Sequence, residues 1–310
     1  MIRIGTRASA LALAQAQLVA HALEHAGETV QVVPMRTEGD RLAAARLAEL
    51  GGKGLFVREI QEALASGTID VAVHSLKDLP AELPPALVLA AFPEREDPRD
   101  VLVTRDGRGL HELPRRAVVG TGSLRRRAFV LALRPDVVVE PIRGNVDTRL
   151  RKLAEGNWDA VILAAAGLKR LRLGPAHAAP LPVDVFVPAV GQGILGIEVR
   201  SDDRATRRVV ENLDHGDTRV CAHAERAYLK RLGASCATAM AAHAVVSRDG
   251  SGARLTMTAV VASEDGARLL RADAAGAPED AAAIGRDLAE SLLHQGAETV
   301  AQLNPGRWAS

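Results

Sequence analysis

Arginines occur at positions where the chain is expected to pass from a strand into a helix. Arg7 follows the first apolar run, and Ser9 then offers a helix N-cap. Arg125 and Arg126 follow Ser123, a second candidate N-cap. Because a helix N-terminus carries partial positive charge, a cation there is unfavourable by roughly 0.3–1 kcal/mol. The arrangement therefore predicts that a bound anion supplies the missing negative charge.

A further junction carries two more arginines. Arg143 follows an apolar run that ends at Ile142, and Arg149 comes a short turn later. In a sheet of parallel strands such junctions can meet at one crevice, so we expect a shared anion site. Two simpler explanations compete with this one. The run 125–127 can be a solvated helix face, and a biased genomic base composition can explain why only five of the 39 basic residues are lysine.

The segment HSLKDLP at 74–80 places a cation beside a carboxylate at the end of the strand-like run IDVAVH. Asp78 facing a cationic crevice would stay ionised and could stabilise a positive centre on a substrate. The competing interpretation is a turn-forming pair, Lys77 and Asp78, ahead of Pro80. His74 by itself is typical of a satisfied core residue.

Two loop segments also carry reactive side chains. GGKGLF at 51–56 holds Lys53 on a glycine-rich turn, which suits either a lid or an ordinary turn and lacks the P-loop pattern. Cys236 lies in the small-residue loop RLGASCATAM, where a cysteine is either incidental or a nucleophile or attachment point. Cys221 falls in an apolar periodicity typical of packing. The cysteines and their neighbouring histidines show no zinc-ligand spacing, so no metal is expected.

Composition excludes several classes of protein. The 310 residues are 47% hydrophobic and 25% charged, with a net charge of +1, so no overall field favours nucleic acid. Aromatic residues make up 2%, too few for a base-stacking platform. No apolar run reaches the ~18 residues of a membrane span, and the start MIRIGTRAS lacks a signal-peptide layout. We expect a cytoplasmic protein.

Strand-like runs alternate with helical patterns along most of the chain, which predicts an α/β fold with mainly parallel sheets. Two internal echoes suggest duplicated lobes, although chance similarity can produce them: IGTRAS resembles VGTGSL, and IDVAVHSLKDL resembles WDAVILAAAGLKRL. The linker candidates 93–100 and 189–196 then predict that the chain enters a second lobe and later returns to the first. The expected domains are 1–93 plus 194–214, 94–193, and a small α/β domain at 215–310.

Taken together, these segments resemble porphobilinogen deaminases, also called hydroxymethylbilane synthases. The resemblance rests on ordered motifs over nearly the whole chain: GTRAS, GGKGLF, HSLKD, EREDPRD, GTGSLRRR, RGNVDTR, AVGQG and the Cys236 loop. It implies two lobes like those of periplasmic binding proteins plus a third, cofactor-bearing domain. It also implies a transferase that condenses four porphobilinogen molecules head to tail on an enzyme-bound dipyrromethane, with loss of ammonia and final hydrolysis.

The resemblance also implies roles for individual residues. Cys236 would carry the dipyrromethane through a thioether, and Asp78 would contact pyrrole N–H groups and stabilise the cationic azafulvene that forms as ammonia leaves. Every pyrrole carries an acetate and a propionate, which would explain the arginines. The residues implied to bind the cofactor are Lys77, Ser123, Arg125, Arg126 and Arg143. Those implied to bind or neighbour the substrate are Arg7, Ser9, Gln15, Lys53, Arg149 and Gln192.

The resemblance further implies a monomer in the heme and tetrapyrrole pathway, with porphobilinogen as its small-molecule partner. A function from another class fits the same lobes, namely a non-catalytic cytosolic module that binds an organic polyanion. Cys236 and Asp78 distinguish the two, because a pure binder needs neither residue.

Overall fold

The computed structural model describes residues 1–35, 54–233, 238–250 and 252–301. Its first lobe is built on a five-stranded sheet of order β2-β1-β3-β10-β4. Strand β1 pairs in parallel with β2 and β3, whereas β10 runs antiparallel to both of its neighbours. The elements are β1 (Ile2–Arg7), α1 (Ala10–His25), β2 (Val30–Met35), α3 (Gly54–Ala65), β3 (Val71–Ser75), the 3₁₀ turn η1 (Leu76–Asp78), β4 (Leu87–Ala91), β10 (Leu195–Arg200) and α7 (Arg204–Glu211).

The second lobe repeats this plan with the order β7-β6-β8-β5-β9. Strand β6 pairs in parallel with β7 and β8, and β5 is antiparallel to both of its neighbours. The elements are β5 (Asp100–Thr104), η2 (Leu110–Glu112), β6 (Val118–Gly120), α4 (Leu124–Leu133), β7 (Val138–Glu140), α5 (Val146–Ala154), β8 (Ala160–Ala164), α6 (Ala165–Arg170) and β9 (Ala178–Pro180). The sequence echoes therefore fall on equivalent elements, β1 with β6 and β3 with β8.

Two segments cross between the lobes, 92–99 and 181–194, and we call them the first and second crossing segments. The first leads from β4 into β5, and the second leads from β9 back into β10. The segment predicted as a linker at 189–196 thus ends inside β10, a buried strand. Gly193 shows why this turn needs glycine: its φ is +87°, and an added Cβ would lie 2.3 Å from the carbonyl oxygen of Glu96.

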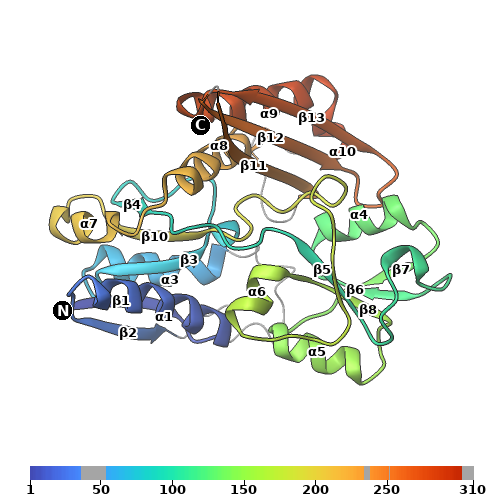
Figure 1. The fold of residues 1–310 in the computed structure, drawn as a ribbon, viewed down its shortest axis with the longest axis horizontal. Helices are drawn as coiled ribbons and strands as arrows, with labels where there is room; N and C mark the ends of the chain where they lie inside the picture. Colours follow the sequence, from blue (N-terminus) through green and yellow to red (C-terminus); the bar gives the residue numbers. More distant parts are fainter. Residues whose placement is uncertain (36–53, 234–237, 251, 302–310) are drawn as a thin grey trace.

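The third domain packs helices against one face of an antiparallel sheet, β11-β12-β13. In Figure 1 it lies above both lobes. Helix α9 approaches α8 so closely that a Cβ on Gly285 would lie 2.1 Å from the carbonyl oxygen of Ala224. The elements are α8 (Gly216–Leu232), β11 (Met240–Asp249), β12 (Gly252–Ala262), β13 (Leu269–Gly276), η3 (Pro278–Asp280), α9 (Ala281–His294) and α10 (Ala297–Val300).

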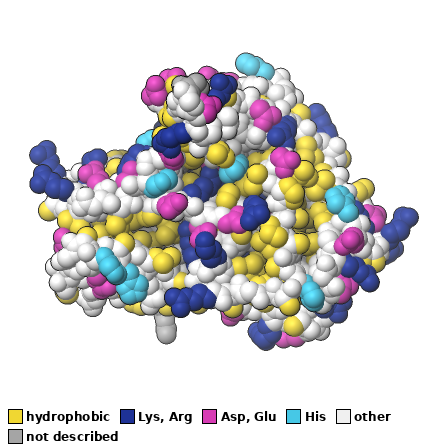
Figure 2. Space-filling view, in the orientation of Figure 1, with side chains coloured by type: hydrophobic (Ala, Val, Ile, Leu, Met, Phe, Trp, Pro, Cys, Tyr) yellow, Lys and Arg dark blue, Asp and Glu magenta, His cyan; other side chains and the backbone are white. Residues whose placement is uncertain are grey.

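The expected fold class is confirmed: two α/β lobes with parallel strands at their centres, plus a small third domain. The exact domain limits given above stay a prediction. In the part of the chain that the structure describes, no helix is both long and apolar enough to cross a membrane. Basic and acidic side chains are interspersed over the face of the molecule shown in Figure 2.

Candidate active site

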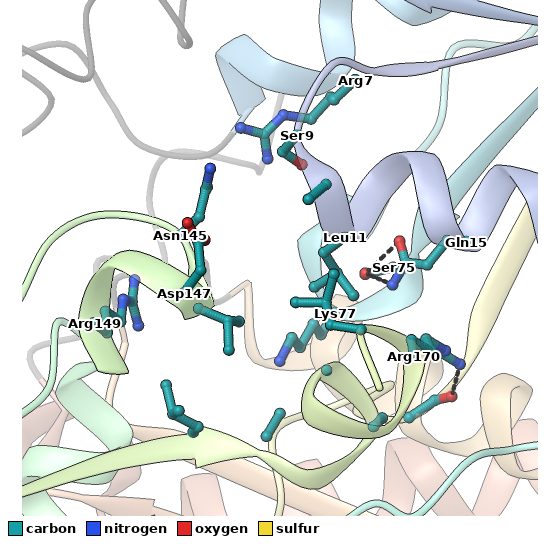
Figure 3. Close-up of a pocket in the computed structure, with 18 of the residues that line it drawn as sticks. Arg7, Ser9, Leu11, Gln15, Ser75, Lys77, Asn145, Asp147, Arg149 and Arg170 are labelled. Atoms are coloured by element: carbon teal, nitrogen blue, oxygen red, sulfur yellow. Dashed lines mark hydrogen bonds between the residues drawn. The ribbon is translucent and has the colours of Figure 1, made fainter. Parts of the chain in front are cut away.

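Two adjoining cavities lie between the lobes, with volumes of about 390 Å³ and about 190 Å³. They share much of their polar lining, so we treat them as one cleft. The N-terminal ends of α1 and α5 face each other across the smaller cavity (Figure 3). The shared charged and polar lining residues are Arg7, Ser9, Gln15, Ser75, Lys77, Arg126 and Arg149.

The first-lobe wall of the cleft starts at the junction of β1 and α1. Ser9 is the N-cap of α1, and its hydroxyl accepts a hydrogen bond from the backbone N–H of Ala12 at 3.4 Å, as predicted. Arg7 ends β1 directly before this cap. One turn into the helix, the buried Gln15 donates from Nε2 to the Ser75 hydroxyl at 2.8 Å, which ties α1 to the end of β3.

Strand β3 runs into the turn η1, which carries Lys77 and Asp78 to the cleft. Both side chains are half-buried and line the larger cavity. His74, at the end of β3, is buried with Nε2 3.1 Å from Oε2 of Glu198 in β10. Its interpretation as a satisfied core residue is therefore confirmed, although it also reaches the cavity lining.

Across the cleft, Ser123 is the N-cap of α4 and accepts from the backbone N–H of Arg126 at 3.4 Å, as predicted. The side chains of Arg125 and Arg126 are buried and turn back toward Asp100, the first residue of β5. Arg125 Nη2 donates to Asp100 Oδ2 at 2.6 Å, and Arg126 donates from Nε and Nη2 to Oδ1 at 3.0 and 2.7 Å.

This geometry corrects the expectation that a ligand alone balances these arginines. The protein supplies part of the negative charge itself, through Asp100. Burial by itself raises the pKa of Asp100, but the charges of Arg125 and Arg126 outweigh it and lower the pKa to about 2. One carboxylate facing two guanidinium groups leaves one net positive charge on this wall.

Helix α5 of the second lobe contributes Arg149 to the cleft. Its Nε donates to the carbonyl oxygen of Gly144 at 2.9 Å, and it lines both cavities. Burial, together with the charge of Arg126, lowers the pKa of Arg149. Arg143 does not join this group: its side chain is exposed and lines neither of the two cavities.

Residue-by-residue analysis of the sequence missed Asp100 and Arg170. Arg170, from α6, lines the smaller cavity and donates from Nη2 to the carbonyl oxygen of Gly193 at 2.7 Å (Figure 3). Burial, opposed by the charge of Glu96, lowers its pKa to about 10. A signal for it was present, since the echo of SLKDL in GLKRL places Arg170 in the second lobe where the first has Asp78.

Lys53 and Cys236 lie outside the described residues. Thr238 and Met240, which follow Cys236 in the chain, line the larger cavity. Cys221 is buried in the core of the third domain, and burial raises the pKa of its thiol to about 12. Within the described ranges, no three His, Cys, Asp or Glu side chains form a group that could hold a metal ion.

Comparison with known proteins agrees with these features. Residues 2–208 match the family model described as "Porphobilinogen deaminase, dipyromethane cofactor binding domain", and residues 219–294 match the C-terminal domain of the same family. The chain belongs to the porphobilinogen deaminase family. It is therefore an enzyme of the transferase class, and dipyrromethane is its cofactor.

Curated porphobilinogen deaminases align over almost their whole length. The protein from Syntrophotalea carbinolica is 50% identical over 301 residues, covering 96% of this chain and 94% of its own. Those from Brevibacillus brevis and Geobacter sulfurreducens are 47% and 48% identical, each covering 96% of this chain and respectively 96% and 93% of their own.

Among solved structures, a periplasmic substrate-binding protein of an ABC transporter from Coxiella burnetii superimposes with a TM-score of 0.43 at 16% identity, covering 69% of this chain and 92% of that one. The two-lobe architecture of the porphobilinogen deaminase chain rests on its own strand orders.

Proposed function

We propose that this chain is a hydroxymethylbilane synthase. It condenses four porphobilinogen molecules head to tail, releases ammonia at each condensation, and hydrolyses the product to the linear tetrapyrrole hydroxymethylbilane. One observation carries the proposal beyond family membership: Asp78 of the first lobe and the buried Arg125 and Arg126 of the second line the same cavity. An acid in a cavity wall that also carries several cations suits a substrate with anionic substituents and a reacting centre that becomes positive.

The charge of the cleft matches the growing product. Each porphobilinogen unit brings an acetate and a propionate, so every cycle adds two carboxylates. Guanidinium groups bind carboxylates as planar forks, and such charge-assisted hydrogen bonds are about twice as strong as neutral ones. The residues that we propose to bind the substrate and the elongating chain are Arg7, Ser9, Gln15, Arg149 and, from the segment outside the described residues, Lys53.

The same cleft fits a dipyrromethane. Arg125 Nε is buried without a hydrogen-bond partner in the described structure, and its side chain lines the larger cavity. A carboxylate of the cofactor would satisfy this orphaned donor. When bound, the cofactor supplies the free pyrrole carbon to which the first substrate unit is joined. We propose Lys77, Ser123, Arg125 and Arg126 as its binding residues; Arg143 stays a prediction, because its side chain is exposed.

We propose Cys236 as the attachment residue. The chain has two cysteines, and Cys221 is a poor candidate because a buried thiol with a pKa of about 12 stays protonated and unreactive. Cys236 is two residues before Thr238, which lines the larger cavity together with Arg125 and Arg126. Its nearness in sequence to a cavity-lining residue supports Cys236 as the better of the two candidates.

Asp78 would act on the charge that develops during the reaction. As the amine leaves porphobilinogen, positive charge spreads over the pyrrole ring and its N–H. A carboxylate held at the cavity wall offsets that charge and accepts the N–H hydrogen bond.

Intact-mass spectrometry tests the proposal. Protein from a host that makes porphyrins should carry the added mass of a dipyrromethane and should release hydroxymethylbilane from porphobilinogen. Cys236→Ser should lose the added mass, whereas the matched variant Cys221→Ser should keep it. An unmodified wild-type mass with no product would favour a polyanion-binding module instead, and an adduct that survives in Cys236→Ser would place the attachment elsewhere.

We propose a cytoplasmic monomer that binds no nucleic acid, supported by the net charge of +1 and by the interspersed charges on the visible face. Light scattering of the loaded enzyme at several concentrations tests the monomer: a mass that rises above one chain would contradict it.

A further inference from the structure

A chain of hydrogen bonds crosses the cleft from one lobe to the other through Gln192. Asp100 Oδ1 accepts from Gln192 Nε2 at 3.1 Å, and Gln192 Oε1 accepts from Lys77 Nζ at 3.2 Å. Gln192 is 1% exposed and Asp100 is fully buried. The second crossing segment thus connects β5 of the second lobe with η1 of the first.

The amide of Gln192 is suited to this place because its two ends have opposite hydrogen-bonding character. Nε2 also donates to the carbonyl oxygen of Pro98 at 2.7 Å, so its donors serve two acceptors while Oε1 faces an ammonium group. Reversing the amide would point donors at Lys77 and an oxygen at Asp100. The orientation is therefore determined by its neighbours, and the side chain acts as a fixed spacer.

Asp100 fixes the other end of this chain of contacts. Besides Gln192, its carboxylate holds both Arg125 and Arg126. The Nη1 atom of each arginine donates to a backbone oxygen: Arg125 Nη1 to that of Val187 at 2.7 Å, and Arg126 Nη1 to that of Ile162 at 2.8 Å. A shift of Asp100 would therefore move both guanidinium groups.

We propose that Asp100 and Gln192 are positioning residues of the transferase reaction. They set Arg125 and Arg126 in the second lobe at a fixed distance from Lys77 and its neighbour Asp78 in the first. The inference deepens the proposed function and rests on it. It also gives Gln192 a role other than substrate contact, because both ends of its buried amide are occupied by the protein.

The test uses enzyme carrying its cofactor, with activity normalised to the loaded fraction measured by intact mass. The variants are Gln192→Met, which keeps the volume and removes both polar ends, Asp100→Asn, and the two combined. The matched control is Asp136→Asn, since Asp136 is also held by an arginine, Arg134 at 2.7 Å, but lies outside the cleft. Each single variant should lower kcat at least tenfold with KM within about threefold, because misplaced lobes affect the reacting geometry more than the binding charge.

The combined variant should lose less than the product of the two single losses, because both changes break one connection. The control should keep wild-type kcat and KM. Three results would overturn the proposal. A raised KM with kcat retained would indicate substrate contact, and a lowered melting temperature with unchanged kcat per loaded enzyme would indicate a purely structural role. The third is a loss of kcat in the combined variant equal to the product of the two single losses. If Asp100→Asn fails to fold, Gln192→Met decides alone, and a wild-type kcat there refutes the inference. Loading and product formation by the wild type, measured beside the variants, test the proposed function separately.

Discussion

Arg95 of the first crossing segment donates from Nη1 to Oε1 of Glu225 in α8 at 2.6 Å, and this pair joins the third domain to both lobes. Glu225 is fully buried and also accepts the backbone N–H of Gly191 at 2.6 Å and of Ala244 at 2.9 Å. Arg95 Nε in turn donates to the carbonyl oxygen of Gln192 at 2.9 Å. Both crossing segments and strand β11 therefore meet at one carboxylate.

Replacing this carboxylate should destabilise the whole protein. Glu225→Gln leaves Arg95, whose side chain is 11% exposed, without its counter-ion, and removing one partner of a buried pair costs about 3–5 kcal/mol. We expect a loss of that order in the free energy of unfolding, measured by urea denaturation. The control is Glu290→Gln, whose exposed pair with Arg231 should contribute less than about 1 kcal/mol. Equal losses in the two variants would contradict the interpretation.

Asp78→Asn should reduce turnover at least 100-fold while the cofactor stays attached. Asparagine keeps the size of the side chain but cannot offset positive charge on the substrate as the amine leaves. Intact mass checks the attachment, and the rate of ammonia release checks the chemistry. The control is Asp106→Asn, an exposed carboxylate paired with Arg108. Near-normal turnover in Asp78→Asn would remove this residue from the reaction.

Arg126 and Arg143 should differ in their importance. Arg126 is buried at the cavity wall, so Arg126→Gln removes a cation from the cleft and one of the two arginine partners of Asp100. We expect elongation to stall, visible by mass spectrometry as enzyme carrying fewer than four added units. Because Arg143 is exposed outside both cavities, Arg143→Gln should slow the reaction only a few-fold. An equal or stronger arrest in Arg143→Gln would show that the cleft extends over the exposed side of this lobe.

His243 in β11 should make stability depend on pH in the mildly acidic range. Burial, assisted by the charge of Arg95, lowers the pKa of His243 to about 4 from its ordinary value of 6.5. Between these values the unfolded chain binds a proton that the folded protein does not, so stability falls as the pH drops from 6.5 toward 4, by at most about 1.4 kcal/mol per pH unit. His243→Gln should flatten this slope in urea denaturation series. An unchanged slope would assign the pH dependence of stability to other groups, such as His223, whose pKa is also lowered by burial.

The local sequence determined the helix N-caps that lie on the two walls of the cleft. Ser9 and Ser123 are N-caps because a hydroxyl three residues before a helical N–H satisfies that donor, a relationship contained within one turn. The same local logic placed Lys77 and Asp78 on a turn after a strand. The ordered motifs also indicated the family, since each motif is a contiguous piece of chain.

Only the tertiary structure determined which charged side chains are already paired within the protein, and with which partners. Asp100 is 26 residues from Arg126 and 92 from Gln192, and Arg95 is 130 residues from Glu225. Asp100 and Arg126 meet inside the second lobe, whereas the other two pairs meet because the chain crosses twice between its lobes. No local pattern encodes these meetings. For the same reason the surplus of arginine was visible in the sequence, whereas burial and long-range pairing determined that Arg126 lines the cleft and Arg143 faces solvent.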